Sequence, residues 1–238
     1  MAPMSDKHRD FWNREYKTSE HLTLSTHPSE DLQKFCRWAE RDYKREFLNP
    51  RGTVLDLGCG NGRNLIYMAE SYGMRGVGYD ISDVAIKDAE KMSEGLPIRY
   101  EVRSIADLID MPDESVTIIL DMMTSHFLKQ AERAVLKAEI LRVLRPGGWL
   151  FFKTFLADED INVRRLLKEH PADEEFSYIH PKMGVYEYVY DEDRMRAFYE
   201  PEFEIHKILK SHKHLRPGRV GDDRAGKRRT MSAYMQKF

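Results

Sequence analysis

The sequence predicts an α/β fold: a doubly wound, mostly parallel sheet with helices on both faces. Between residues 53 and 155, short apolar runs alternate with helix-length amphipathic segments. The first of these runs enters a glycine-rich turn, Val54–Gly62. Two late segments, Phe203–Leu209 and Thr230–Lys237, alternate apolar and polar residues in the manner of a hairpin. Strands that alternate with helices form βαβ units, whose parallel strands are covered by helices on both faces.

Composition excludes several other classes of protein. A chain of 238 residues with 41% hydrophobic and 33% charged residues suits one α/β domain and is neither collagen, coiled coil nor wholly disordered. No apolar run approaches the roughly 20 residues of a membrane helix, and residues 1–20 lack the apolar core of a signal peptide. Two cysteines, Cys36 and Cys59, cannot form a disulfide framework. We therefore expect a soluble, cytoplasmic protein with no membrane partner.

The elements follow one another in a regular order. Residues 1–49 predict an N-terminal helical segment, in which apolar residues recur at helical spacing from Leu32 to Phe47 before Pro50-Arg51-Gly52 breaks the helix. Gly73 is a helix-stop residue, and Ser82 is a helix cap. Arg145-Pro146-Gly147-Gly148 forms a sharp turn into the fifth strand. The core predictions are strands at Thr53–Leu57, Arg75–Ile81, Ile98–Val102, Val116–Leu120 and Trp149–Phe155, and helices at Arg63–Tyr72, Asp83–Met92 and Ala131–Leu144.

The pattern is less regular after Phe155, where we expect an insertion at about residues 157–200 within a domain that spans residues 50–238. Its predicted parts are a helix at Asp158–His170, a loop at Pro171–Pro181, a short strand at Val185–Tyr190 and a helix at Asp191–Tyr199. We expect this insertion to border the site of a second substrate.

The glycine turn Val54–Gly62 is suited to a ligand with an amine and a carboxylate. It lacks the third glycine of a dinucleotide-binding motif at the required position, which is Arg63, and no Walker lysine follows it. Glycines allow a ligand to approach the backbone, and the helix that follows offers free N–H groups to an anionic group. Asp56 at the strand end would repel a pyrophosphate but attract a cationic amine.

A second anchor lies at the end of the next strand. Asp80 follows Gly60 by 20 residues and can accept hydrogen bonds from both hydroxyls of a ribose, while Ile81 offers an apolar surface to a base. A nucleoside joined to an amino acid satisfies both anchors. S-adenosylmethionine is the obvious molecule of this kind.

These motifs resemble a known family. V-L-D-L-G-C-G-N-G, then G-Y-D-I-S, then L-R-P-G-G before a strand are similar to the motifs of the class I S-adenosylmethionine-dependent methyltransferases, over roughly residues 50–156. The resemblance implies an enzyme that uses S-adenosylmethionine and releases S-adenosylhomocysteine. It also implies seven strands in the order 3-2-1-4-5-7-6, with the last strand antiparallel. The alternative is a related domain that binds no cofactor, in which the glycines only make turns.

The resemblance also implies roles for individual residues. The methionine part would be held by Asp56 and the loop backbone, the ribose by Asp80, and the adenine by Ile81. Many relatives have an acid after the third strand, where this chain has Ser104, followed by Ile105 as a source of packing or of a backbone contact. Asp121 and Met122 would face the methionine part and the methyl group. The implied loop residues are Gly58, Cys59, Gly60, Asn61 and Gly62.

The site of the methyl acceptor is less defined by the sequence. The fourth strand is not followed by an N/D-P-P-Y/F motif, which disfavours methylation of adenine N6 or of a glutamine amide. His126 is the candidate general base, because it follows that strand and histidine titrates near neutral pH. A structural histidine that caps the next helix is the alternative. His180, Tyr186 and Glu187 in the insertion are either acceptor-site residues or ordinary packing residues.

Two further features point to different acceptors. Trp12 and Tyr16 share one helix face and resemble a W-x-x-x-Y element that covers the cofactor in small-molecule methyltransferases, although such a pair is also common in cores. Residues 207–229 carry nine Lys or Arg against two Asp, which suits an acidic metabolite, an RNA backbone or simply a solvated loop. We find no pattern of metal ligands.

The sequence therefore predicts methyl transfer to the oxygen, nitrogen or sulfur of a small acceptor, with an acidic one favoured by the basic segment. The first alternative is an RNA or protein methyltransferase that docks through residues 207–229. The second is a protein that binds S-adenosylmethionine or S-adenosylhomocysteine without catalysis.

Overall fold

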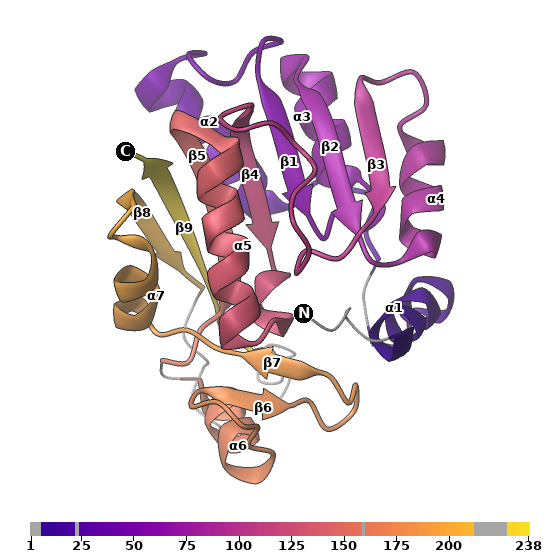
Figure 1. The fold of residues 1–238 in the computed structure, drawn as a ribbon, viewed down its shortest axis with the longest axis vertical. Helices are drawn as coiled ribbons and strands as arrows, with labels where there is room; N and C mark the ends of the chain where they lie inside the picture. Colours follow the sequence, from indigo (N-terminus) through magenta and orange to yellow (C-terminus); the bar gives the residue numbers. More distant parts are fainter. Residues whose placement is uncertain (1–5, 22–23, 159, 212–227) are drawn as a thin grey trace, which may run out of the picture.

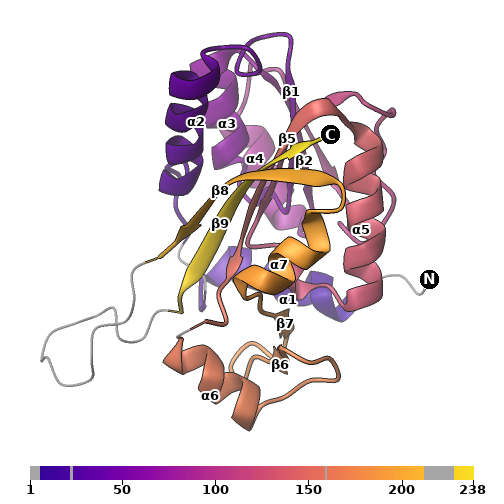
Figure 2. The same ribbon diagram turned by 90° about the vertical axis from the view of Figure 1, so that its left-hand side faces the viewer.

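The computed structural model describes residues 6–21, 24–158, 160–211 and 228–238. A seven-stranded sheet lies between two layers of helices (Figures 1 and 2), and a two-stranded sheet lies beside its lower edge in Figure 1. The strand order of the large sheet is β3-β2-β1-β4-β5-β9-β8. When the two strands of the small sheet are set aside, this is the predicted order 3-2-1-4-5-7-6. β9 pairs antiparallel with both β5 and β8, which confirms the predicted fold class.

The strands and helices have the following bounds. The large sheet contains β1 (Thr53–Leu57), β2 (Arg75–Asp80), β3 (Ile98–Val102), β4 (Val116–Met122), β5 (Leu144–Phe155), β8 (Phe203–Lys210) and β9 (Thr230–Lys237). The small sheet contains β6 (Ser177–Ile179) and β7 (Tyr186–Tyr188). The helices are α1 (Asp6–Thr18), α2 (Glu30–Tyr43), α3 (Arg63–Tyr72), α4 (Asp83–Met92), α5 (Gln130–Val143), α6 (Ile161–Glu169) and α7 (Glu192–Tyr199), with a short 3-10 helix η1 (Ser125–Phe127). Among the described residues, no helix has the length and apolar character needed to cross a bilayer.

The sheet separates two hydrophobic cores. One core lies under α5 and α7 and includes Leu136 and Tyr199, while the other lies under α2, α3 and α4 and includes Phe35, Leu65 and Ile86. All five residues of β1 are buried because this strand is covered on both faces. That burial explains why its sequence is a continuous apolar run with a single carboxylate instead of an alternating pattern.

The register of the central strands brings their carboxyl ends together. β1 pairs in parallel with β2 on one side and with β4 on the other, so that Leu57 lies opposite both Tyr79 and Asp121. This is the point at which the strand order reverses, and ligands of open α/β sheets bind outside the strand ends there. α1 and the small sheet lie at the same edge in Figure 1.

Three elements differ from the sequence prediction. α2 ends at Tyr43 instead of continuing to Phe47, because Lys44 adopts a left-handed φ of 54° that terminates the helix. The predicted loop at residues 171–181 contains β6, which pairs with β7 through only three residues on each strand. Such a short strand is held by its partner rather than by a sequence period of its own.

The third difference concerns the Arg145–Gly148 turn. β5 begins at Leu144, and this segment bulges within the strand, since Val116 pairs with Leu144 but Ile118 pairs with Trp149. Gly147 has a φ of +70°, which a glycine adopts readily.

An aromatic cluster attaches α2 to the sheet, and it predicts a stability effect. Phe35 is fully buried, stacks on Phe151 at 5.3 Å and meets Tyr234 edge-on at 5.0 Å between ring centroids. Phe35→Ala leaves a cavity beneath α2 and is expected to lower the free energy of unfolding by about 3–5 kcal/mol. Urea denaturation measures this change. Phe238→Ala is the control, because Phe238 is 70% exposed and its loss should cost less than about 0.5 kcal/mol. Equal effects of the two substitutions would contradict the assignment of Phe35 to the core.

Candidate functional site

A cavity of about 500 Å³ opens at the carboxyl edge of the central strands. Its walls come from the loops that follow β1, β2 and β4, from helix α1, and from the insertion that contains β7. The chain thus brings several regions that are distant in sequence to one site. A volume of this size is typical of a pocket for a small-molecule ligand.

The glycine turn is held in place by the end of β2. The backbone N–H groups of Gly58 and Cys59 both donate to the carbonyl oxygen of Tyr79, at 2.8 and 2.9 Å. The N–H of Gly60 donates to Oδ2 of Asp80 at 2.9 Å. Gly60 has a φ of +55°, and a Cβ at this position would lie 2.6 Å from the hydroxyl oxygen of Tyr16. Glycine is favoured here, because other residues adopt this φ with strain and a Cβ would require the Tyr16 hydroxyl to shift.

Three buried carboxyl groups gather at the ends of β1, β2 and β4. Asp56, Asp80 and Asp121 are 1%, 6% and 0% exposed. Burial raises the pKa of Asp56 to about 7, with a further contribution from the charge of Asp80. Burial also raises the pKa of Asp80 and of Asp121 to about 6. A cationic ligand would stabilise the ionised forms of these groups, so the cavity has a negative end that is suited to an ammonium or sulfonium group.

The hydrogen bonds of these carboxylates show which of them is open to a ligand. Asp80 accepts from the N–H groups of Gly60 and Ser82, both at 2.9 Å, and this fixes its orientation at the cavity wall. Oδ2 of Asp56 has no hydrogen-bond partner in the described part of the chain, although Asp56 lines the cavity. The residues present fit S-adenosylmethionine: Asp56, with its unpartnered oxygen, would hold the amine, and Asp80 would hold the ribose.

Helix α1 contributes the side of the cavity that faces the glycine turn. Trp12 and Tyr16 both line the cavity, and Trp12 meets Phe127 edge-on at 5.0 Å between ring centroids. Asn13 fastens the helix to the start of α4: its Oδ1 accepts from the hydroxyl of Ser82 at 2.7 Å, and its Nδ2 donates to Asp83 at 2.5 Å. Because Ser82 follows Asp80 by two residues, α1 is attached directly beside the expected ribose site.

The end of α1 also holds a group that sequence reasoning did not identify. The buried carboxylate of Glu15 contacts Nδ1 of His21 at 2.7 Å and accepts from its backbone N–H at 2.9 Å. Glu15, Glu20 and His21 bring potential metal-ligand atoms within 4.8 Å of one another. Within this group, the Glu15 carboxylate is already paired with the side chain and the backbone N–H of His21.

The segment between α1 and α2 is tied to the glycine turn by three long-range contacts. Nδ2 of Asn61 donates to the carbonyl oxygen of Ser25 at 3.1 Å, and the backbone N–H of Ser29 donates to Oδ1 of Asn64 at 3.0 Å. Arg63 donates to the carbonyl oxygen of His27 at 3.1 Å. Ser25 and Ser29 line the cavity, but no local motif in the sequence marks them.

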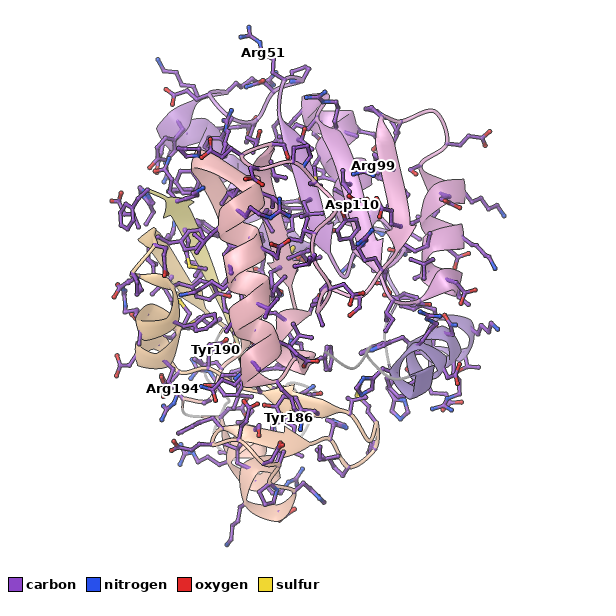
Figure 3. All side chains as sticks on the ribbon, in the orientation of Figure 1. Arg51, Arg99, Asp110, Tyr186, Tyr190 and Arg194 are labelled. Atoms are coloured by element: carbon purple, nitrogen blue, oxygen red, sulfur yellow. The ribbon has the colours of Figure 1, made fainter. Side chains whose placement is uncertain are left out.

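The opposite end of the cavity contains His126, Phe155, Glu187 and Arg228. His126 is 1% exposed, and its ring lies 5.1 Å from that of Phe155 between centroids. Burial lowers the pKa of His126 to about 4, so the imidazole is neutral at pH 7. It does not cap α5 and forms part of the cavity wall instead. Tyr186, labelled in Figure 3, lies in the adjoining strand β7 and also lines the cavity.

Most of the predicted residues come together in this cavity, and four do not line it. The predicted residues that line it are Trp12, Tyr16, Asp56, Gly58, Cys59, Gly60, Asn61, Asp80, Ile81, Ile105, Met122, His126, Tyr186 and Glu187. The four that do not are Gly62, Ser104, Asp121 and His180.

Each of these four has a local structural role. Gly62 is the N-cap of α3 with a φ of +76°, and Asp121 accepts from the backbone N–H of Ser125 at 3.0 Å behind the wall. The hydroxyl of Ser104 accepts from the N–H of Ala106 at 3.1 Å, and Nδ1 of His180 accepts from the N–H of Met183 at 3.3 Å. Arg103, one residue before Ser104, lines the cavity instead.

Comparison with known proteins agrees with the geometry. Residues 54–148 match the family model described as a methyltransferase domain. The chain is 29% identical over 126 residues to the 2-methyl-6-phytyl-1,4-hydroquinone methyltransferase of Synechocystis, and 30% identical over 109 residues to a phthiotriol/phenolphthiotriol dimycocerosates methyltransferase of Mycobacterium ulcerans. These alignments cover 52% and 45% of this chain but only 39% of each relative.

A solved structure gives the same answer for the fold. A SAM-dependent methyltransferase from Methanosarcina mazei superposes with a TM-score of 0.66 at 22% identity, over 83% of this chain and 97% of that one. The fold is that of a Rossmann-like methyltransferase domain. Residues 54–148 thus form a methyltransferase domain, and the matches and the fold together support a class I S-adenosylmethionine-dependent methyltransferase whose cofactor is S-adenosylmethionine.

The ribose assignment predicts a loss of affinity. Asp80→Ala removes the acceptor oxygens at the end of β2, and it should weaken the binding of S-adenosylhomocysteine by about 1.5–3 kcal/mol in calorimetric titration. Asp88→Ala is the control, because Asp88 is an exposed residue of the neighbouring helix α4. Unchanged affinity of Asp80→Ala would remove Asp80 from the cofactor site.

The raised pKa of Asp56 predicts a pH dependence of binding. Only the ionised carboxylate attracts an ammonium group, so affinity for S-adenosylhomocysteine should fall as the pH is lowered from 8 to 5.5, through the pKa of about 7. The slope approaches about tenfold per pH unit once Asp56 is mostly protonated. Asp56→Asn should bind weakly and flatten this part of the curve. A wild-type affinity that is constant over this range would contradict the assignment of Asp56 to the amine.

Proposed function

We propose that the chain transfers the methyl group of S-adenosylmethionine to the oxygen, nitrogen or sulfur of a small acceptor. One observation carries the proposal: a single cavity joins the carboxylates of the cofactor end to His126, Tyr186 and Glu187 of the insertion. A cofactor bound at Asp56 and Asp80 would direct its sulfonium group toward this second end. The positions of α1 and β7 around the cavity favour an acceptor of limited size.

The proposed chemistry is an in-line displacement. The cofactor supplies a methyl group activated by a positively charged sulfur. The protein residues then have to bind the acceptor, align it with that methyl group and exclude water, and alignment alone lowers the barrier substantially. Trp12 and Tyr16 on α1 would act as a lid over the cofactor, which is consistent with their place in the cavity wall.

The two relatives are named for a hydroquinone and a phthiotriol acceptor, so their names support small-molecule acceptors in general. An acidic acceptor stays a prediction that rests on the basic segment at residues 207–229. Residues 212–227, with Lys213, Arg216, Arg219, Arg224 and Lys227, lie outside the described residues.

We also propose a cytoplasmic location, which the two unpaired cysteines support.

Three of the described basic residues of that segment, Lys210, Arg228 and Arg229, contact the protein itself. Lys210 lies 2.9 Å from Glu192, and Arg228 pairs with Glu187. Arg229 donates to the carbonyl oxygens of Asp158 and Ser211, both at 3.0 Å. These contacts give no specific support to docking of RNA, so an RNA or protein methyltransferase and a non-catalytic binder are outcomes of the test below.

Binding and turnover together test the proposal. We expect calorimetry to show saturable binding of S-adenosylhomocysteine at one site per chain. Gly60→Val should abolish it, since the side chain would enter the space next to Tyr16. Methyl transfer from labelled S-adenosylmethionine is then screened against small hydroxyl, amine and thiol compounds, followed by RNA and protein. Cofactor binding with no turnover on any acceptor would favour a non-catalytic binder, and turnover on RNA alone would favour docking through the basic segment.

A further inference from the structure

A buried carboxylate with one free oxygen lies at the acceptor end of the cavity. Glu187 on β7 is fully buried, yet it lines the cavity. Its Oε2 accepts from the hydroxyl of Tyr178 at 2.6 Å and from the guanidinium of Arg228. Its Oε1 has no hydrogen-bond partner among the described residues. A buried oxygen of this kind is costly unless a ligand or water satisfies it, so it marks a position where a hydrogen-bond donor is expected.

The surroundings of Glu187 reinforce this expectation. The ring nitrogens Nδ1 and Nε2 of His126 are likewise without partners in the described part of the chain. The neutral imidazole offers one donor and one acceptor. Arg228 lies over the ring of Phe155 at 3.4 Å, and His126 packs against the edge of the same ring. These residues form a compact polar group around Phe155.

The described positive charges at this end, Arg228 and Lys153, are already balanced. The guanidinium of Arg228 is paired with Glu187, and Nζ of Lys153 lies 2.6 Å from Oδ2 of Asp31. An anionic reacting group placed here would therefore face the free oxygen of Glu187 without an uncommitted cation from the described ranges 6–21, 24–158, 160–211 and 228–238 to stabilise it. A hydroxyl or amine would instead donate a hydrogen bond to that oxygen.

We infer that the group methylated by this protein is a hydroxyl or an amine, and that Glu187 is the catalytic residue that binds it through Oε1. This inference rests on the proposed methyltransferase function. The acceptor oxygen or nitrogen forms a bond to the methyl carbon while the carbon–sulfur bond breaks. The electron pair of the broken carbon–sulfur bond stays on sulfur. The acceptor proton passes to Oε1 of Glu187 and from there to solvent. The charges balance, because one sulfonium and one carboxylate become a thioether and a carboxylic acid.

Electrostatics explains why a carboxylate is useful at this position. A neutral oxygen or nitrogen gains positive charge as its bond to the methyl carbon forms. A preorganised negative charge beside that atom stabilises the transition state more than the ground state. The contacts from Tyr178 and Arg228 hold the carboxylate in one orientation, so no reorganisation is needed when the acceptor reacts.

Binding of simple probes tests the inference without knowledge of the natural acceptor. Four compounds share a benzyl or phenyl ring that suits the aromatic wall: benzylamine, benzyl alcohol, benzyl methyl ether and benzoate. Each is titrated into the protein saturated with S-adenosylhomocysteine. We expect the amine and the alcohol to bind at least about fivefold more tightly than the ether or benzoate, and Glu187→Gln to abolish this preference. Benzoate or the ether binding as tightly as the donors would overturn the inference.

Two further variants separate a specific effect from a general loss of structure. Glu202 forms an ion pair with Lys137 at 2.9 Å and lies outside the cavity. Glu202→Gln therefore also removes a paired carboxylate, but it should leave the preference for hydrogen-bond donors unchanged. Tyr178→Phe keeps the charge of Glu187 and should keep the preference for donors. If Glu187→Gln fails to fold, the ranking in the wild type and in Tyr178→Phe decides the question. Failure of the wild type to bind S-adenosylhomocysteine would refute the proposed function itself, whereas normal binding with no preference among probes would refute only the role of Glu187.

Discussion

The meeting of three parallel strand ends at one edge of the sheet is the constraint on which the site depends. β1 pairs with β2 and β4 in a register that brings Asp56, Asp80 and Asp121 to the same buried edge. Carboxylates in such a place repel one another and lose hydration, and both effects favour protonation. The backbone N–H groups of the glycine turn and of the start of α4 compensate Asp80, while Asp56 keeps one oxygen without a described partner. The negative end of the cavity thus follows from the topology.

This arrangement links function to stability in a defined direction. A carboxyl group whose pKa is raised in the folded state contributes stability that is fully present below its unfolded pKa and is lost as the pH rises through the folded value. For Asp56 that window lies between about 4 and about 7, and for Asp80 and Asp121 between about 4 and about 6. At neutral pH the free protein therefore bears a cost at this edge, and a cationic ligand removes it. Binding of the cofactor should raise the free energy of unfolding of the whole sheet, because these groups lie on its central strands.

The sequence predicted those features that depend on the residue types and positions within one strand or turn. The strand order, the glycine turn and the placing of Asp56, Asp80 and Ile81 at one cavity all depend on local patterns and on the general rule for parallel sheets. The prediction was incomplete where a contact joins distant residues. Lys153 pairs with Asp31, which lies 122 positions away in the sequence, and no local pattern predicts such a contact. Ser104 does not line the cavity: its hydroxyl accepts from the N–H of Ala106, and Arg103 lines the cavity instead.

The insertion shows why cofactor sites can be identified from sequence more easily than acceptor sites. The cofactor end is built from the sheet itself, whose spacing is fixed by backbone hydrogen bonds. The proposed acceptor end is built from β7, whose three residues pair with β6. Arg228, which precedes β9, completes it by pairing with Glu187. Tyr188 of β7 packs against the core under α5 and α7, whereas Tyr186 and Glu187 belong to neither core. Acceptor specificity is therefore free to vary while the glycine turn and its carboxylates stay the same, and the position of Glu187 on β7 suits a residue that selects the acceptor.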